Sequence, residues 1–232
     1  MRARLPFRRR SRRPDHYPPG PLRDLAAAPA PPPTTPASQL ELLSLDLETT
    51  GLDPRTDHVL SLGWVPVVEG RVLLGEAREH RVRPPEGVDV GSSATFHRLT
   101  DDALTGAPAL PEVLPLLLGD LHGRVLLAHP AALEVDFVGA AAVSAYGARP
   151  PLTVVDTLAL EHRLRADLNG EVHGSLRLEA ARRAHGLPSY SAHHALTDAV
   201  AAAELLLAQV AELERRLDRE VLLQDLRPRR SG

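Results

Sequence analysis

A short apolar run that ends in two acidic residues constrains the fold of this chain more than any other feature. Residues 42–47 read Leu-Leu-Ser-Leu-Asp-Leu, and the sequence Glu-Thr-Thr-Gly follows. This pattern is typical of a buried strand that leads into a turn. Because side chains alternate along a strand, Asp46 and Glu48 point to the same side of the sheet. Carboxylates that close repel each other unless a cation holds them, although a strand end that emerges into solvent would show the same spacing.

The pattern of the remaining segments predicts an α/β fold. Strand-like runs at 59–68 and 72–82 are separated by Glu-Gly-Arg, which favours an antiparallel hairpin. Further strands are expected at 125–128 and 152–155, and helices at 111–121, 131–146, 157–165, 175–185 and 195–217. Three strands followed by a helix, a strand and more helices predict a mixed sheet with helices on both faces.

Composition separates one domain from two tails. Residues 1–38 contain eight arginines, two acidic residues and ten of the 22 prolines. We expect this segment to be a solvated tail without a core of its own, although such a basic arm could also attract nucleic-acid phosphates. The expected domain then covers residues 39–220, and residues 221–232 form a second tail.

The composition also excludes several classes of protein and site. The chain has no cysteine, which rules out disulfides, thiolate nucleophiles and cysteine-ligated metals and suits a reducing cytoplasm, the expected compartment. No uncharged apolar run approaches ~18 residues, so we expect no membrane span. The net charge is −3, and because the first tail is basic, the rest of the chain is acidic.

Two further carboxylates occupy positions where an ionised group is costly. Glu134 shares one face of its predicted helix with Phe137 and Val138, the face expected to contact the sheet. Asp198 lies in the first turns of a helix that is apolar nearly all round. Both need a metal, a hydrogen-bond partner or a raised pKa. The alternatives are that Glu134 snorkels from the edge of the apolar stripe and that Asp198 interacts with the helix dipole.

Acidic residues at strand and helix ends, in a chain without cysteine, favour Mg²⁺ or Mn²⁺ over Zn²⁺. Two such ions ~3.5–4 Å apart form the usual clamp for in-line attack on a phosphodiester. The chemistry also needs a base, and His193 and His194 precede Asp198 by five and four residues. Helical spacing favours His194, whereas a loop position would leave His193 free to reach a metal-bound water. Both could also be surface histidines at a helix start, so spacing leaves the choice open.

Three motifs in this order resemble the DnaQ-like 3′–5′ exonucleases of the DEDDh type, a family that includes the epsilon proofreading subunit of bacterial DNA polymerase III. The first reads Leu-Asp-Leu-Glu-Thr-Thr-Gly-Leu over residues 45–52. The second is His-Pro-Ala-Ala-Leu-Glu over 129–134, with Phe137 three positions further on. The third is the spacing from His193 through Ala195 to Asp198. The resemblance covers about residues 40–213 and implies a ribonuclease H-like sheet with three antiparallel strands followed by parallel strands.

The resemblance also implies a role for individual residues. It implies that two Mg²⁺ or Mn²⁺ ions are held by Asp46, Glu48, Glu134 and Asp198, and that His193 is the general base. The substrate-binding residues that it implies are Thr49, Gly51, Leu52, His97, His129 and Phe137. Asp156, at the end of a predicted strand, is expected to cap the following helix rather than to take part in catalysis.

Two residues depart from the family pattern. Glu134 stands where the family usually has Asp, and Pro130 stands where it has Asn. Because catalytic geometry tolerates little displacement, we expect an altered rate or metal preference rather than an inactive protein.

The function implied by the resemblance is removal of nucleotides from the 3′ ends of single-stranded DNA in proofreading or repair, in association with a DNA polymerase. The alternatives are an exoribonuclease and a weakened relative that binds nucleic acid without cleaving it. Aromatic residues make up only 3% of the chain, so recognition by base stacking is expected to be limited. No residue reports on the 2′-hydroxyl, so the choice between DNA and RNA stays open.

Overall fold

A single mixed sheet organises the computed structural model, which describes residues 14–88, 90, 101–166, 171–172, 174–190 and 193–227. Its strands are β1 (Leu42–Thr49), β2 (Val59–Val68), β3 (Arg71–Val72), β4 (Arg78–Arg81), β5 (Val125–Ala128) and β6 (Val154–Asp156). Their order is β3-β2-β1-β5-β6, and β4 also pairs with β2. The α-helices are α1 (Pro21–Ala27), α3 (Asp101–Leu104), α4 (Leu110–Asp120), α5 (Ala131–Tyr146), α6 (Thr157–Arg165), α7 (Leu178–Ala184), α8 (Ala195–Leu217) and α9 (Leu223–Leu226).

One strand, β2, runs opposite to its neighbours in the sheet. β2 is antiparallel to β1, β3 and β4, whereas β1, β5 and β6 are mutually parallel neighbours. This arrangement confirms the predicted sheet of antiparallel strands followed by parallel strands. The carboxyl ends of β1, β5 and β6 therefore meet at one edge, where ligands of open α/β sheets commonly bind.

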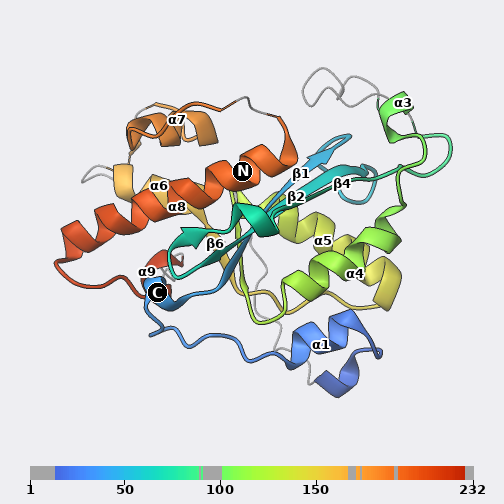
Figure 1. The fold of residues 1–232 in the computed structure, drawn as a ribbon, viewed down its shortest axis with the longest axis horizontal. Coiled ribbons are helices and arrows are strands. Elements are labelled where there is room, and N and C mark those ends of the chain that lie inside the picture. The colour runs from blue at the N-terminus through green and yellow to red at the C-terminus, as the bar shows by residue number, and fades with distance from the viewer. Residues whose placement is uncertain are drawn as a thin grey trace.

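The alternation of side chains along β1 divides the core into two layers. Leu43, Leu45 and Leu47 pack with apolar residues of α1, α4 and α5 on one face. Leu42 packs with residues of α6, α8 and α9 on the other face. Figure 1 shows α8 crossing one side of the sheet, with α4 and α5 on the opposite side. Because Asp46 and Glu48 are an even number of residues from Leu42, they lie on the α8 face.

Most predicted segments match the structure, and three need correction, one of them the strand expected at 152–155, which is Val154–Asp156. The predicted strands 59–68 and 125–128 and helices 131–146, 157–165 and 195–217 are confirmed to the residue. The predicted strand 72–82 is interrupted by a 3₁₀ turn at Leu74–Glu76, so that β3 and β4 pair separately with β2. The predicted helix 175–185 is shorter, because α7 begins at Leu178.

The described parts of both predicted tails pack against the domain, which corrects the expectation of solvated ends. Tyr17, Leu22 and Leu25 are buried in the core layer that includes α4. A few well-placed leucines anchor the segment in spite of its many prolines. The two ends also meet, because the Leu223 N–H donates to the Thr35 carbonyl at 2.8 Å. In the part of the chain that the structure describes, no helix is long and apolar enough to cross a membrane.

Candidate active site

Two acidic side chains enter the site from the end of β1. Asp46 lies opposite Gly63 of β2 in the strand register, and Glu48 lies opposite Ser61. The preceding leucines fix this strand in the core, so the two carboxylates are held on a rigid element. They face the first turn of α8, as the period of the strand requires.

The first turn of α8 lies directly against the sheet because Gly63 has no side chain. A Cβ atom on Gly63 would lie 2.1 Å from the backbone nitrogen of Leu196. The hydroxyl of Ser44 donates to the Ala199 carbonyl at 2.6 Å and fixes the same contact. This close approach brings Asp198 to the β1 carboxylates. The sequence signal for it was a glycine inside an apolar strand, which commonly marks a close backbone approach.

His193 is the histidine that joins the acidic residues. One carboxylate oxygen of Glu48, one of Asp198 and one ring nitrogen of His193 all lie within 4.8 Å of one another. The backbone N–H of His193 also donates to Asp198 Oδ2 at 2.9 Å. His194 instead lies with its Nδ1 3.3 Å from Glu79 Oε1 on β4. Of the two histidines that spacing left open, the geometry therefore favours His193.

Glu134 completes the cluster from the first turn of α5. Its side chain is 2% exposed, as predicted for the helix face that contacts the sheet. Its Oε2 atom is buried and has no hydrogen-bond partner among the described residues. Burial, with a contribution from the charge of Asp156, raises the pKa of Glu134 to about 8.

Electrostatics show that the four carboxylates share one site. Burial and the charges of Glu134, Asp198 and Glu48, in that order, raise the pKa of Asp46 well above its ordinary value. Burial and the charge of Asp198 raise the pKa of Glu48 to about 7. Burial also raises the pKa of Asp198, although hydrogen bonding from the His193 backbone opposes the shift. Without cations to balance their negative charges, these carboxyl groups therefore retain protons to a higher pH than usual.

The donor set fits hard divalent cations. Carboxylate oxygens and one imidazole suit Mg²⁺ or Mn²⁺, and the unpartnered Glu134 oxygen is a buried acceptor that a cation would satisfy. Four carboxylates would balance two divalent ions. Asp46, Glu48, Glu134 and Asp198 are thus the residues that could hold such ions.

The turn after β1 contains three of the residues implied in substrate binding. The Thr49 hydroxyl donates to the Gly51 carbonyl at 2.6 Å, and Leu52 is 82% exposed. A Cβ on Gly51 would lie 2.5 Å from an Asp57 carboxylate oxygen. A side chain at position 51 would therefore require the Asp57 side chain to move.

The imidazole of His129, a residue expected to bind substrate, is held by contacts inside the protein. His129 is 9% exposed, and burial lowers the pKa of its imidazole. Its Nε2 lies 2.9 Å from the Leu176 carbonyl and its Nδ1 lies 2.8 Å from Thr157 Oγ1. Both ring nitrogens are thus engaged inside the protein, where His129 supports the edge of the sheet, and its contact with substrate stays a prediction. His97, the other histidine of that set, lies outside the described residues.

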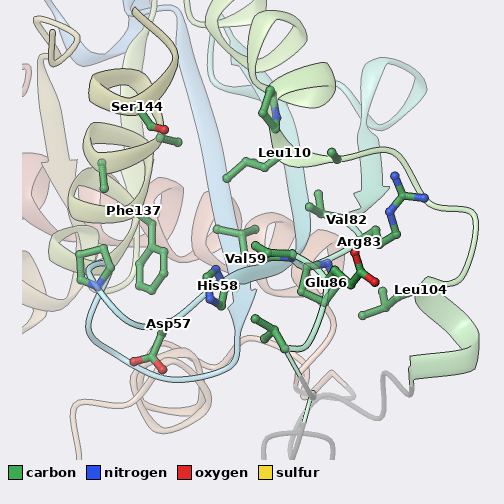
Figure 2. Close-up of a pocket in the computed structure, with 18 of the residues that line it drawn as sticks. Asp57, His58, Val59, Val82, Arg83, Glu86, Leu104, Leu110, Phe137 and Ser144 are labelled. Carbon is green, nitrogen blue, oxygen red and sulfur yellow. The ribbon is translucent and has the colours of Figure 1, made fainter. Parts of the chain in front are cut away.

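Phe137, one helical turn after Glu134, lines a cavity whose wall includes none of the four carboxylates and not His193. The cavity has a volume of about 920 Å³. Figure 2 shows Phe137 and Ser144 of α5 on one side, with Val82, Arg83, Glu86 and Leu104 on the other and His58 and Val59 between them. Phe137 is mostly buried and presents only a small area to this space.

Asp156 does more than the sequence suggested. Its Oδ1 accepts from the backbone N–H groups of Leu158 and Ala159, which confirms the predicted cap of α6. Its Oδ2 also accepts from the Ala131 N–H at the start of α5. Pro130 offers no capping side chain to α5, so Asp156 supplies one from the neighbouring strand.

Comparison with known proteins agrees with this geometry. The exonuclease family of the RNase T type matches residues 43–206. A DNA polymerase III subunit epsilon-like protein of Rhodobacter capsulatus is 32% identical over 184 residues, which cover 78% of this chain and 25% of that protein. A PolC-type DNA polymerase III of Thermotoga petrophila is 28% identical over 171 residues, 74% of this chain and 12% of that protein. The chain thus spans a quarter or less of the length of these relatives.

Solved structures show the same fold. Exonuclease X in complex with 5′ overhanging duplex DNA superposes with a TM-score of 0.59 at 21% identity, covering 74% of this chain and 92% of that one. Exonuclease I of E. coli in complex with a dT13 oligonucleotide gives a TM-score of 0.66 at 16% identity, covering 78% of this chain and 43% of that one. Motifs, sheet, acidic cluster and sequence similarity agree, and the chain belongs to the DnaQ-like exonuclease family of metal-dependent nucleases.

Proposed function

We propose that this protein removes nucleotides from the 3′ end of single-stranded DNA by hydrolysing the terminal phosphodiester. The observation that supports this most directly is the meeting of Glu48, Asp198 and His193 within 4.8 Å, beside Asp46 and the buried Glu134. These residues come from three distant stretches of the chain. A cluster that pairs several carboxylates with one histidine suits activation of water for attack on a phosphate.

In this proposal Asp46, Glu48, Glu134 and Asp198 would hold two divalent cations. When bound, such ions lower the pKa of a coordinated water and stabilise charge on the leaving oxygen. The carboxylates themselves orient the site, because they project from the rigid elements β1, α5 and α8.

His193 acts as the base in the proposed reaction. A ring nitrogen of neutral His193 accepts a proton as the water oxygen bonds to phosphorus and the phosphorus–O3′ bond breaks. The departing O3′ takes up a proton from solvent, so that one nucleotide and a shortened strand result. Leu52, exposed on the turn after β1, and the cavity beside Phe137 are the proposed contacts for the terminal nucleotide.

Digestion of matched oligonucleotides tests this function. DNA and RNA strands of one sequence, labelled at either the 3′ or the 5′ end, are incubated with Mn²⁺, with Mg²⁺ or with EDTA. We expect stepwise shortening from the 3′ end of DNA that requires metal and is abolished by Asp46→Ala and by His193→Ala. Preferred digestion of RNA would establish an exoribonuclease instead, and binding without turnover would establish a weakened relative.

The proposed role in proofreading or repair, with a DNA polymerase as partner, rests on the relatives. They are described as a DNA polymerase III epsilon-like protein and PolC-type DNA polymerases III. Cells lacking this gene would then show an increased mutation rate, measured by fluctuation assay. An unchanged rate, together with purification free of any polymerase, would contradict the role but not the activity.

A further inference from the structure

Arg182 on α7 is a buried cation that none of the site motifs includes. The residue is 2% exposed. Its guanidinium Nη1 donates to the Ala201 carbonyl at 2.7 Å, and its Nη2 donates to Glu204 Oε2 at 2.8 Å. Both partners belong to α8, the helix whose first turn supplies Asp198. Arg182 therefore fixes α7 to the helix that forms one wall of the active site.

The same guanidinium also holds the segment that connects α7 to α8. Its Nη2 donates to the Pro188 carbonyl at 2.9 Å. Its central carbon lies 4.5 Å from the centre of the Tyr190 ring, in a cation–π contact. The Tyr190 hydroxyl in turn donates to Glu204 Oε1 at 3.0 Å. Glu204 thus receives Arg182 on one oxygen and Tyr190 on the other.

Tyr190, which Arg182 contacts, precedes His193 by three positions in the chain. His193 has a φ of 67°, a left-handed conformation that is uncommon for a residue other than glycine. Such a conformation persists only where the surrounding structure holds it. On its far side His193 is held by the bond from its backbone N–H to Asp198. Earlier in the chain, Arg182 contacts Pro188 and Tyr190.

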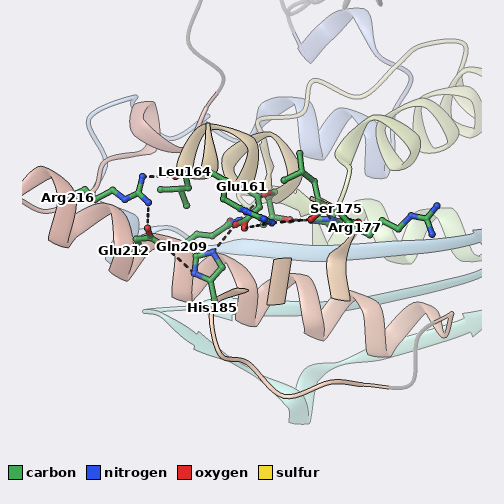
Figure 3. Close-up of polar contacts among 12 residues, drawn as sticks. Glu161, Leu164, Ser175, Arg177, His185, Gln209, Glu212 and Arg216 are labelled. Atoms are coloured by element: carbon green, nitrogen blue, oxygen red, sulfur yellow. Dashed lines mark hydrogen bonds and ion pairs between the residues drawn. The ribbon is translucent and has the colours of Figure 1, made fainter. Parts of the chain in front are cut away.

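A second polar network holds the end of α7 against α6 and α8. The Nε2 of His185 lies 2.8 Å from Glu161 Oε2 on α6, and its Nδ1 lies 3.4 Å from Glu212 Oε2 on α8. Gln209 donates to the same Glu161 oxygen at 2.9 Å. Figure 3 shows His185 lying between Glu161 and Glu212. Because these contacts hold α7 against α6 and α8, the position of Arg182 relative to the connecting segment is fixed.

We infer that Arg182 is a positioning residue that sets the location of the His193 imidazole through Pro188 and Tyr190. The inference rests on the proposed function, in which His193 is the base. A buried ion pair is weak support for stability, because apolar residues of similar volume often replace one without loss. Hydrogen bonds from one planar guanidinium to two backbone carbonyls and a carboxylate instead fix the relative positions of these three groups. Arg does this better than Lys, because its donors have a fixed planar arrangement.

The test compares Arg182→Met with a matched control. Arg183→Met removes the neighbouring arginine, which is exposed and pairs only at the surface with Glu179. The substrate is a 3′-labelled DNA strand in Mn²⁺, and kcat and KM are measured separately. We expect kcat of Arg182→Met to fall about 10- to 100-fold, because ~1 Å of displacement costs up to 100-fold. We expect KM and the Mn²⁺-induced rise in melting temperature to stay within twofold of wild type, and Arg183→Met to leave all of these unchanged.

Two further variants guard against a general loss of structure. Arg182→Lys retains the positive charge but not the planar set of guanidinium donors, and we expect its kcat to lie between those of Arg182→Met and wild type. Tyr190→Ala removes a 40% exposed ring, so it should fold even if Arg182→Met does not, and we expect a several-fold lower kcat. Wild-type kcat in a folded Arg182→Met or in Tyr190→Ala overturns the inference, as does loss of the Mn²⁺ effect together with kcat. An inactive wild-type chain overturns the proposed function itself and is therefore distinguishable.

Discussion

The carboxylate of Asp156 accepts a hydrogen bond from the backbone N–H of Ala131 at 3.2 Å and so joins the end of β6 to the start of α5. The same carboxylate caps α6 with its other oxygen. Because Glu134 lies in the first turn of α5, the position of an acidic residue of the site depends on a side chain outside it.

Replacing Asp156 separates these two capping roles. Asp156→Ala removes both caps, and we expect the free energy of unfolding to fall by about 1–3 kcal/mol, since one cap is worth about 0.5–2 kcal/mol. Asp156→Asn keeps one carbonyl oxygen for α6 but offers an amide group to Ala131, so we expect a smaller loss. Urea unfolding of both variants measures the difference. Equal stability of Asp156→Ala and wild type would show that the caps contribute nothing.

Gly63 is the residue on which the approach of α8 to the sheet depends. A Cβ at this position meets the backbone of α8 rather than a movable side chain, so Gly63→Ala must displace the helix. We expect a loss of stability of about 1–3 kcal/mol or more, as for overpacked cores, and a strongly reduced kcat. Gly119→Ala in α4 is the control, because a Cβ there meets nothing within 4 Å. Thermal unfolding and the nuclease assay together check this, and a Gly63→Ala protein as stable and active as the control would contradict it.

The acidic cluster predicts how stability depends on pH when metal is absent. The pKa values of Glu48 and Glu134 are raised to about 7 and about 8, so the folded protein keeps protons that the unfolded chain releases above about pH 4.5. The contribution of these groups is complete at low pH and is lost as the pH rises through their folded pKa values. We therefore expect the melting temperature in EDTA to fall between about pH 5 and pH 9.

Divalent cations should oppose this loss, because they bind the ionised carboxylates of the folded protein. We expect millimolar Mn²⁺ to raise the melting temperature more at about pH 8 than at about pH 5. Asp46→Asn should weaken both the pH effect and the Mn²⁺ effect. A melting temperature that is the same in EDTA and in Mn²⁺ at about pH 8 would count against the metal site.

Leu52 should affect substrate binding without affecting stability. Its side chain is 82% exposed, so Leu52→Ala should change the free energy of unfolding by less than about 0.5 kcal/mol. If the side chain contacts the terminal nucleotide, KM rises several-fold. Leu74→Ala, at an exposed leucine on the turn between β3 and β4, is the matched control. An equal KM in both variants would remove Leu52 from the proposed substrate contacts.

The sequence predicted those features that repeat along the chain. Hydrophobic periodicity placed the helices at 131–146, 157–165 and 195–217, where the structure has α5, α6 and α8. It also predicted that Glu134 lies on the helix face toward the sheet, and the residue is buried. Where a segment is short and half exposed, as at 72–82, the pattern did not reveal the 3₁₀ turn that divides β3 from β4. The packed leucines of α1 were hidden by the average composition of a basic, proline-rich segment.

Features that arise from contacts across the fold were not predictable. Spacing alone could not choose between His193 and His194, because their difference lies in a backbone turn and in Glu79 on another strand. His129 matches the family motif, yet its bonds to Thr157 and Leu176 place it inside the protein. The contacts of Arg182 involve two helices and the segment between them, which no local pattern encodes.

The cavity beside Phe137 has a consequence for how such a nuclease can diversify. Much of its wall comes from residues 82–88 and 104–111, whereas the acidic cluster projects from β1, α5 and α8. If the cavity receives the terminal nucleotide, as proposed, selection acting on these wall segments can change which strand ends are accepted while the hydrolytic groups stay in place. Substrate range and chemical step can therefore evolve as separate traits on this scaffold.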